Sequence, residues 1–299
     1  MDTVMSFRVY EPDALELCDT CIQIVQSLES ALSVTDPDSA LYAINAAGQG
    51  QLPDSAAVLL TRTLELCRRT DGALDPTVYP IVRLWGFPDR DYRVPSQQEL
   101  AQALSRVGYN NATVTGTSVQ LAAGTQLDLG SVAKGYAGQL CAERLTELGV
   151  SACLNLGGNT QTVGDKPDGT PWQIGIADPD DAGSAIAVLT LQGTNAIVTS
   201  GDYQRCFTQA GQRYHHIMDP ATGYPADSGL RSVTIVARDG LLADGLSTAL
   251  FVMGLEEATD FWRQSDDFEA VLIDQNRNLY VTQGLADRIT GCTFTVITR

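Results

Sequence analysis

The sequence predicts a protein of the α+β class, in which mixed, mostly antiparallel sheets are flanked by helices. Two observations carry this prediction. Residues 160–236 are apolar mainly at every second position and are interrupted by the turn sequences PDGTP, DPDDAG and ATGYP, which is typical of antiparallel strands. Segments with the apolar spacing of helices stand before and after this region, and this mixed order of strands and helices indicates α+β.

The first part of the chain predicts one strand followed by helices. Residues 2–10 alternate and are rich in strand-forming side chains, and from Asp13 to about Leu32 apolar residues recur at the spacing of one helix face. Turn and capping residues before later apolar runs predict helices at about 39–44, 55–70 and 96–107. Two short strands are expected within residues 112–127.

The second part predicts a helix from about residue 132 to 148, because Gly149 then supplies a helix stop. A strand is expected at 151–156, before the antiparallel region. After that region the sequence predicts helices at about 241–253 and 256–263 and three strands within 268–299. There is no internal repeat and no segment with the composition of a linker, so no domain boundary is evident.

Composition restricts the classes of function. With 299 residues, of which 44% are hydrophobic, the chain can form one large globular domain or two closely associated ones. Its 19 basic and 36 acidic residues give a formal net charge of −17, which argues against nucleic-acid binding. An acidic protein that handles polyanions needs a divalent cation at the site, although solubility alone also explains the charge. No run of about 18 apolar residues predicts a membrane helix.

The seven cysteines do not predict a disulfide framework, because their number is odd. Cys18 and Cys21 form a C-x-x-C sequence within a predicted amphipathic helix. There is no second pair and no nearby histidine, which argues against a zinc site. We expect the thiols to be buried as small apolar groups.

The segment LDLGSVAKGY, residues 127–136, is the most informative of the chain. It places a carboxylate, backbone amides and an ammonium group around a glycine turn, where a predicted helix begins. Such a turn suits a ligand that carries phosphate.

Two later segments contain the partners that a phosphate site requires. In ADGLST, Asp244 and Thr248 share one face of a predicted helix and Ser247 lies close to it. This set suits Mg²⁺, and the alternative is a helix-start acid and a threonine bonded back to its own helix. HHIMDPATGYP contains the two histidines, His215 and His216, before a turn. One of them serves as a general base or holds a phosphate, unless both are surface residues beside a turn.

Two weaker segments complete the set. The glycines of NLGGN, residues 155–159, either allow close approach of the backbone to a ligand or simply form a turn. The aromatic pair in the sequence LWGF, residues 84–87, suits the wall of a flavin or adenine site or the protein core. Neither a Rossmann fingerprint nor a P-loop is present.

Six segments in a common order resemble the ApbE family of FAD:protein FMN transferases over nearly the whole chain. They are GALDPTVYPIVRLWGF, LDLGSVAKGYAGQLCAERLTELGV, NLGGNTQTVG, TSGDYQRCF, HHIMDPATGYP and ADGLSTALFVMG. The resemblance implies one ApbE-like, T-fold-like unit over residues 1–299, with a larger α+β core, a smaller subdomain and a cleft for FAD between them. It implies Mg²⁺ as cofactor, FAD as substrate and a client flavoprotein as acceptor.

The resemblance also assigns roles by position. The side-chain metal ligands match Asp244 and Thr248, with Ser247 adjacent, and Ser131 matches a ligand that acts through its main-chain oxygen. His216 and Asp244 match the catalytic residues. The positions that match contacts with the flavin nucleotide are Met1, Trp85, Gly86, Phe87, Asp128, Lys134, His216 and Ile217.

The implied reaction is attack of a client threonine or serine hydroxyl on the FMN-side phosphorus of FAD, with AMP as the leaving group. Thr35 stands where many family members carry a tyrosine that packs against the flavin nucleotide. This departure gives a second hypothesis, a Mg²⁺-dependent FAD pyrophosphatase that releases FMN and AMP. A third is a flavin-binding or carrier module without catalysis, against which Asp244, Thr248 and His216 argue.

The family resemblance further implies an extracytoplasmic protein, anchored by lipid in its full-length form, with a targeting segment upstream of Met1. The seven cysteines fit an oxidising compartment poorly.

Overall fold

The structure, a computed structural model, describes residues 3–299. These residues divide into two compact units. The helical unit consists of residues 26–133 and 204–227, and the sheet unit consists of residues 3–25, 134–203 and 228–299. Both units contain helices and antiparallel strands, which confirms the predicted α+β class.

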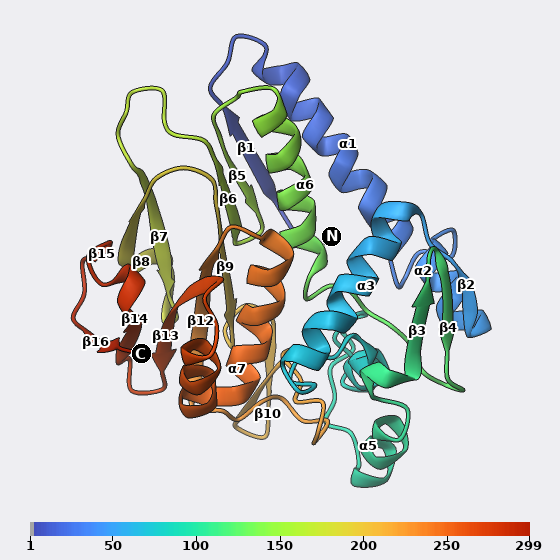
Figure 1. The fold of residues 1–299 in the computed structure, drawn as a ribbon. Coiled ribbons are helices and arrows are strands. Elements are labelled where there is room, and N and C mark those ends of the chain that lie inside the picture. Colours follow the sequence, from blue (N-terminus) through green and yellow to red (C-terminus); the bar gives the residue numbers. More distant parts are fainter. Residues whose placement is uncertain (1–2) are drawn as a thin grey trace. The chain divides into compact units, whose positions relative to one another are not determined.

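The helical unit contains most of the helices predicted for the first part of the chain (Figure 1). They are the last part of α1 (Ala14–Leu32), α2 (Ala40–Ala47), α3 (Asp54–Arg69) and α5 (Gln97–Leu104). The unit also contains α4 (Tyr79–Leu84), which the sequence analysis did not predict, and the short turns η1 (Pro76–Val78) and η2 (Tyr109–Asn111). α5 begins with a capping box, in which the Ser96 hydroxyl accepts from the Glu99 N–H and the Glu99 carboxylate accepts from the Ser96 N–H.

Two small sheets complete the helical unit. One pairs β2 (Gln49–Gln51), β4 (Ser118–Leu121) and β3 (Ala112–Thr115) in this order, and the other is the hairpin of β10 (Cys206–Gln209) and β11 (Gln212–His215). A buried apolar cluster packs α4 against α5 and consists of Ile81, Trp85, Phe87, Leu100, Ala103 and Met218. This cluster fixes the chain just after α4, where the sequence LWGF lies.

The sheet unit is centred on an eight-stranded sheet. Its strands, in spatial order, are β1 (Met5–Val9), β5 (Ala152–Leu156), β6 (Asn159–Val163), β9 (Asn195–Gly201), β12 (Leu230–Ala237), β13 (Phe268–Asp274), β14 (Leu279–Thr282) and β16 (Phe294–Ile297). All neighbours are antiparallel except β14 and β16. The prediction of mostly antiparallel sheet over residues 160–236 is therefore confirmed.

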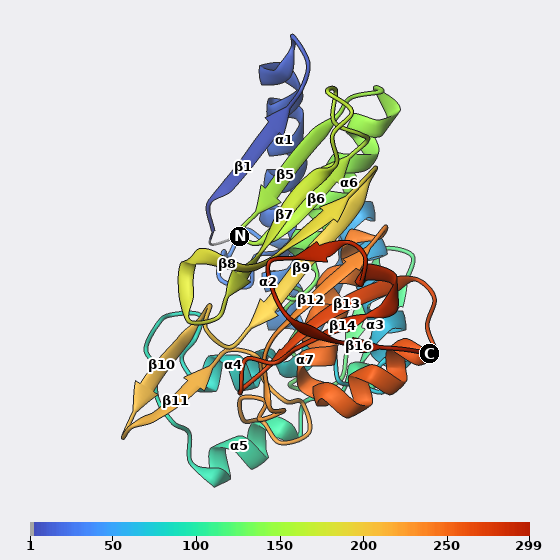
Figure 2. The ribbon, with the colours of Figure 1, turned by 90° about the vertical axis from the view of Figure 1, so that its left-hand side faces the viewer.

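The two faces of this sheet are covered differently (Figures 1 and 2). A three-stranded sheet of β15 (Ile289–Thr290), β8 (Asp181–Leu191) and β7 (Trp172–Asp178) packs on one face, where Leu189 of β8 shares an apolar cluster with Ile197, Val236 and Val271. The helices α6 (Ala133–Glu147) and α7 (Gly240–Arg263) lie on the other face, and α7 contacts β9 and β12. Because side chains alternate along a strand, the central strands β9 and β12, which are covered on both faces, are buried along most of their length.

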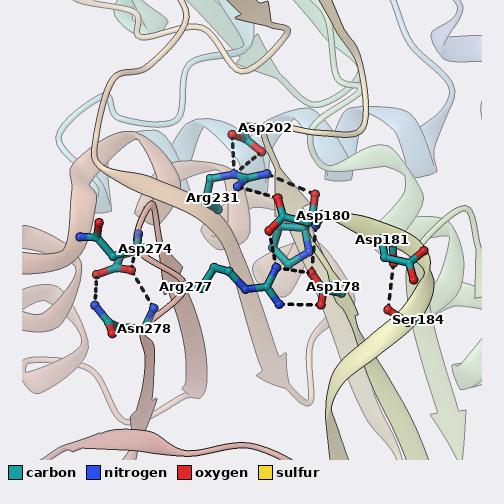
Figure 3. Close-up of polar contacts among 11 residues, drawn as sticks. Asp178, Asp180, Asp181, Ser184, Asp202, Arg231, Asp274, Arg277 and Asn278 are labelled. Atoms are coloured by element: carbon teal, nitrogen blue, oxygen red, sulfur yellow. Dashed lines mark hydrogen bonds and ion pairs between the residues drawn. The ribbon is translucent and has the colours of Figure 1, made fainter.

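An ion-pair network ties the β7–β8 turn to β12 and to the β13–β14 turn (Figure 3). Arg231 Nε lies 2.9 Å from Asp202 Oδ2, and Arg231 Nη1 lies 3.0 Å from Asp180 Oδ1. Arg277 pairs with Asp180 and, at 2.8 Å, with Asp178. Asp202 directly follows β9, so the network also fixes the end of this strand.

Two features of the C-terminal region test the predicted elements. The sequence predicts two helices within 241–263, and the backbone of α7 is indeed interrupted at Gly254, which has φ 79° and ψ 177°. The prediction of three terminal strands was wrong, because four are present and β15 joins the three-stranded sheet. A two-residue strand is too short to show a period in the sequence. Within residues 3–299, no helix has the length and apolar character needed to cross a membrane.

Candidate functional site

The Asp244 carboxylate is buried where α7 packs against the beginning of α6. Its Oδ2 accepts a hydrogen bond of 2.8 Å from the Gly135 N–H, and Lys134 Nζ lies 3.9 Å from its Oδ1. Burial raises the pKa of this carboxyl group, and the Lys134 charge and the Gly135 N–H oppose that rise. The end of the segment LDLGSVAKGY therefore supplies the charge and the hydrogen bond that compensate the Asp244 carboxylate.

This contact depends on two glycines that allow the helix backbones to approach closely. A Cβ added to Gly135 would lie 2.1 Å from the Gly240 carbonyl oxygen and 2.6 Å from Asp244 Cβ. A Cβ added to Gly240 would lie 2.2 Å from the Gly135 carbonyl oxygen. Any larger residue at either position would separate α6 from α7 and withdraw the Gly135 N–H from Asp244.

The hydroxyl groups of Ser247 and Thr248 lie on α7 next to Asp244. The Ser247 hydroxyl donates to the Asp244 main-chain oxygen at 2.8 Å, and Ser247 is fully buried. Thr248 is only half-buried and stands one helical turn after Asp244. Both hydroxyls also contact Ser200 of β9, at 2.8 Å and 3.3 Å respectively. The structure thus places the two predicted side-chain ligands, Asp244 and Thr248, together with the adjacent Ser247 within the sheet unit.

Asn159 at the start of β6 adjoins the same carboxylate. It is 5% exposed, and it lowers the pKa of Asp244, which opposes the effect of burial. Its Nδ2 makes no hydrogen bond of normal geometry. The Asn159 amide is therefore one of the groups that compensate the buried charge of Asp244.

In the helical unit, the first part of LDLGSVAKGY forms a firmly held turn. The Asn45 side chain makes two hydrogen bonds to the backbone of Leu127: it accepts from the N–H at 2.7 Å and donates to the oxygen at 2.8 Å. The Asp128 Oδ1 accepts from the Gly130 N–H at 2.8 Å, so this carboxylate stabilises the turn itself. Ser131 is half-buried and follows this turn directly. The contacts predicted for Asp128 with flavin and for the Ser131 main-chain oxygen with metal stay predictions.

The two histidines differ in their surroundings. His215 is 9% exposed, and its Nε2 donates to the Ala226 oxygen at 3.1 Å. His216 is half-buried, and its Nδ1 lies 3.3 Å from the Arg205 oxygen. A carbonyl oxygen only accepts hydrogen bonds, so this contact assigns the proton of neutral His216 to Nδ1 and the lone pair to Nε2. His216 therefore has the tautomer that a base acting through Nε2 requires.

The aromatic side chains of the LWGF segment belong to the core of the helical unit. Trp85 is fully buried, and its indole N–H donates to the Gly223 oxygen at 2.9 Å. Phe87 is 7% exposed and stands 6.4 Å, between ring centres, from His216. Gly86 has φ 77°, and a Cβ there would lie 1.8 Å from the Asp91 oxygen, so only glycine fits this turn.

These positions bear on the predicted flavin contacts. The Trp85 ring packs inside the protein rather than forming an open wall, and Ile217 is likewise buried at 5% exposure. A role for them towards FAD stays a prediction. Met1, the remaining predicted contact, lies outside the described residues.

The described residues contain no group of three or more histidine, cysteine or acidic side chains arranged for a metal. A cation at Asp244 would instead be held by one carboxylate, hydroxyl and main-chain oxygens, and ligand phosphates, which is the mixture that Mg²⁺ prefers. Asp244 is only 3% exposed, so its negative charge is poorly solvated by water and a nearby cation would stabilise it. The donor set therefore fits a magnesium ion.

Sequence reasoning did not single out two residues that lie at this site, Ser200 and Asn159. Both belong to segments that carry the family resemblance, TSGDYQRCF and NLGGNTQTVG. Their types, a serine on a strand and an asparagine after two glycines, are common in ordinary sheet and turns. Only the pairing of β6 with β9, the strand that packs against α7, brings both residues to this site.

Comparison with known sequences gives a consistent picture. The sequence profile of the ApbE family matches residues 1–272. A Treponema pallidum protein named FAD:protein FMN transferase is 35% identical over 287 residues, which cover 89% of this chain and 79% of the relative. A Klebsiella pneumoniae protein of the same name is 31% identical over 291 residues, covering 94% and 89%.

Solved structures agree with this result. The crystal structure of the ApbE protein from Thermotoga maritima has a TM-score of 0.88 and 32% identity, and the match covers 94% of each chain. The flavin transferase ApbE from Vibrio cholerae has a TM-score of 0.83 and 28% identity, with 96% of each chain covered.

Proposed function

Because the chain belongs to the ApbE family, we propose that it transfers FMN from FAD to a threonine or serine hydroxyl of a client protein and releases AMP. The relatives named FAD:protein FMN transferase support the transfer of FMN. The observation that carries the proposal is the placement of the buried Asp244 carboxylate beside the half-buried Thr248 hydroxyl and the Lys134 ammonium group. This combination suits a pyrophosphate substrate with its accompanying cation.

Asp244 and Thr248 would hold Mg²⁺, with Ser131 contributing its main-chain oxygen. When bound, the ion would polarise the pyrophosphate of FAD and neutralise its charge. Ser247 has a different role, because it is fully buried and its hydroxyl contacts both the Asp244 main-chain oxygen and the Ser200 hydroxyl.

The residues of the chain would position the substrate and accept one proton from the client hydroxyl. Lys134 balances the negative charge of both Asp244 and a nearby phosphate. His216 accepts the proton of the client hydroxyl at Nε2 while that oxygen forms its bond to the FMN-side phosphorus. The bond between this phosphorus and the bridging oxygen breaks, and AMP leaves with that oxygen. FMN then remains on the client as a phosphoester, and proton and charge balance.

Hydrolysis of FAD is the second candidate, and Thr35 favours it. Thr35 is exposed in the loop after α1, where its hydroxyl lies 3.4 Å from the Ser33 hydroxyl. A threonine in this place cannot cover a flavin ring as a tyrosine does, and water then has access to the phosphorus. The two activities share Asp244 and Thr248 and differ only in the acceptor.

A client-transfer assay tests the proposal. The protein is incubated with FAD, Mg²⁺ and a client flavoprotein segment, and mass spectrometry measures the client while chromatography measures AMP and FMN. Transfer predicts a client heavier by FMN less water, with AMP formed in equal amount. Hydrolysis predicts free FMN and AMP whether or not the client is present.

Two variants locate the chemistry. Asp244→Ala should abolish the release of AMP, and His216→Ala should slow transfer about 10²–10⁴-fold, the usual contribution of a general base. A client with alanine in place of its acceptor residue is the matched control and should stay unmodified. Full activity of Asp244→Ala would refute the metal assignment. FAD that survives long incubation with Mg²⁺ and client would instead support the third hypothesis, a flavin carrier.

We further propose the extracytoplasmic location and lipid anchor that the family resemblance implies. Fractionation of cells that express the full-length gene product tests this. Recovery of the protein only from the cytoplasm would refute it.

A further inference from the structure

Three hydroxyl groups of the sheet unit, on α7 and β9, form a hydrogen-bonded chain that ends at the Asp244 main-chain oxygen. The Ser200 Oγ on β9 lies 2.8 Å from the Ser247 Oγ and 3.3 Å from the Thr248 Oγ1, both on α7. The Ser247 Oγ lies 2.8 Å from the Asp244 main-chain oxygen. The roles assigned so far do not use Ser200.

The direction of each hydrogen bond follows from the number of protons. A hydroxyl group has one proton, and a carbonyl oxygen only accepts. Ser247 therefore donates its proton to the Asp244 oxygen, so Ser200 must be the donor in its contact with Ser247. The single proton of Ser200 is then in use, and Thr248 must be the donor in the longer contact with Ser200.

This direction decides what Thr248 offers to a ligand. With its proton held by Ser200, the lone pairs of Thr248 Oγ1 point away from β9. Thr248 is half-buried, whereas Ser247 is fully buried. A helical threonine ordinarily donates to the carbonyl four residues earlier, which is Asp244 here, but the two lone pairs of that oxygen already accept from the Ser247 hydroxyl and, by the helical pattern, from the Thr248 N–H. Ser200 is the acceptor that replaces it.

The position of Ser200 is fixed by the sheet. Ser200 stands opposite Val233 of β12, and the next pair is Gly201 with Ser232. Beyond this pair, the Asp202 N–H donates to the Arg231 oxygen at 3.0 Å, and the side chains of the same two residues form the ion pair of Figure 3. The backbone of Ser200 is therefore fixed against β12.

We propose that Ser200 is a positioning residue. It accepts a hydrogen bond from the Thr248 hydroxyl and thereby directs a lone pair of Thr248 Oγ1 to the divalent cation. The inference rests on the proposed function in so far as that function places a cation at Asp244 and Thr248. Ser200 itself touches neither the cation nor FAD.

Binding of Mn²⁺ to the full chain tests the inference without any transfer reaction. The signal of free Mn²⁺ in electron paramagnetic resonance gives the Kd, measured with the metal alone and again with FAD present. Ser200→Ala should raise this Kd about three- to tenfold, the effect expected for losing one net hydrogen bond. Ser200→Thr keeps the hydroxyl and should restore the affinity.

The matched control is Thr199→Val on the same strand. The Thr199 hydroxyl lies 2.8 Å from the Thr234 hydroxyl, so this variant also removes one hydroxyl contact between β9 and a neighbour, but it leaves the Ser200 chain intact. Its Kd for Mn²⁺ should change less than twofold. In a Thr248→Val background, Ser200→Ala should have no further effect, because Ser200 acts only through Thr248.

The outcomes separate the two proposals. If Asp244→Ala abolishes Mn²⁺ binding while Ser200→Ala binds as tightly as the unchanged protein, the role of Ser200 is refuted and the metal site stands. Equal weakening by Ser200→Ala and Thr199→Val also refutes it. If the unchanged protein binds no Mn²⁺, or if Asp244→Ala binds Mn²⁺ as tightly as the unchanged protein, both the metal assignment and the role of Ser200 are refuted.

Discussion

Replacement of Gly135 by alanine is the most direct test of how α6 holds Asp244. The new Cβ would lie 2.1 Å from the Gly240 oxygen and 2.6 Å from Asp244 Cβ, whereas normal contacts are about 3.5 Å. The helices must therefore separate by about 1 Å, which costs roughly 1–3 kcal/mol as overpacking. Withdrawing the Gly135 N–H from the buried carboxylate adds about 1–3 kcal/mol. The better helix propensity of alanine offsets about 1 kcal/mol of this destabilisation.

The sum is a loss of about 3 kcal/mol in the free energy of unfolding. For a chain of 299 residues, each kcal/mol lowers the melting temperature by about 1.6 °C, so Gly135→Ala should melt about 5 °C lower. Thermal unfolding followed by circular dichroism in the presence of a chelator measures this without any contribution from metal. Mn²⁺ affinity should fall in the same variant, because Asp244 moves with α7.

Gly138→Ala is the matched control on the same helix. A Cβ at Gly138 would lie 3.6 Å from Leu156 Cδ1 and 3.7 Å from Gln161 Cβ, which are ordinary contacts. This variant should keep the melting temperature or raise it, because alanine adds up to about 1 kcal/mol of helix propensity to the free energy of unfolding. Equal melting temperatures for the two variants would refute the close-packing argument at Gly135.

Three further predictions concern the helical unit. Gly86→Ala should destabilise the protein strongly and lower its yield of folded material, because its φ of 77° and the 1.8 Å approach to the Asp91 oxygen both exclude a Cβ; a normal thermal melt would contradict this. The capping hydrogen bonds from Ser96, together with Arg93, lower the pKa of Glu99 to about 2. The contribution of ionised Glu99 to stability is therefore complete above the unfolded pKa of about 4.3 and is lost as the pH falls through 2. The difference in melting temperature between the unchanged protein and Glu99→Gln should therefore be largest near pH 7 and shrink below pH 4, and a constant difference would contradict the capping box. Burial raises the pKa of the Cys67 thiol, so iodoacetamide should label Cys67 more slowly than the half-buried Cys206 at pH 8, as peptide mass spectrometry can show; equal labelling rates would contradict this.

The cysteines illustrate what composition can and cannot predict. All seven are free thiols in the structure, in agreement with the prediction from their odd number. The expectation that they are buried holds for Cys21, Cys67 and Cys141, whereas the other four are partly exposed. An odd count excludes only a framework that pairs every cysteine, and the exposure of each thiol depends on which elements cover it.

Local sequence determined much of the fold of this protein. The helical spacing of residues 13–32 and 132–148 predicted α1 and α6, and alternation predicted the antiparallel strands, because these periods are properties of the elements themselves. It also placed Asp244 and Thr248 on one face of a helix, since residues four apart always share a face. The two-residue β15 escaped prediction because it is too short to have a period and exists only through its partner β8.

Tertiary structure alone decided what surrounds Asp244. The sequence separates Gly135, Asn159, Ser200 and Asp244 by up to about a hundred residues, and no local pattern shows that they meet. The same holds for Trp85, whose aromatic ring suits a flavin wall or a core equally well until packing with Phe207, Tyr214 and Tyr224 buries it. Residue types fix which chemistry is available, whereas burial, proton direction and charge compensation arise from long-range contacts that only the folded chain makes.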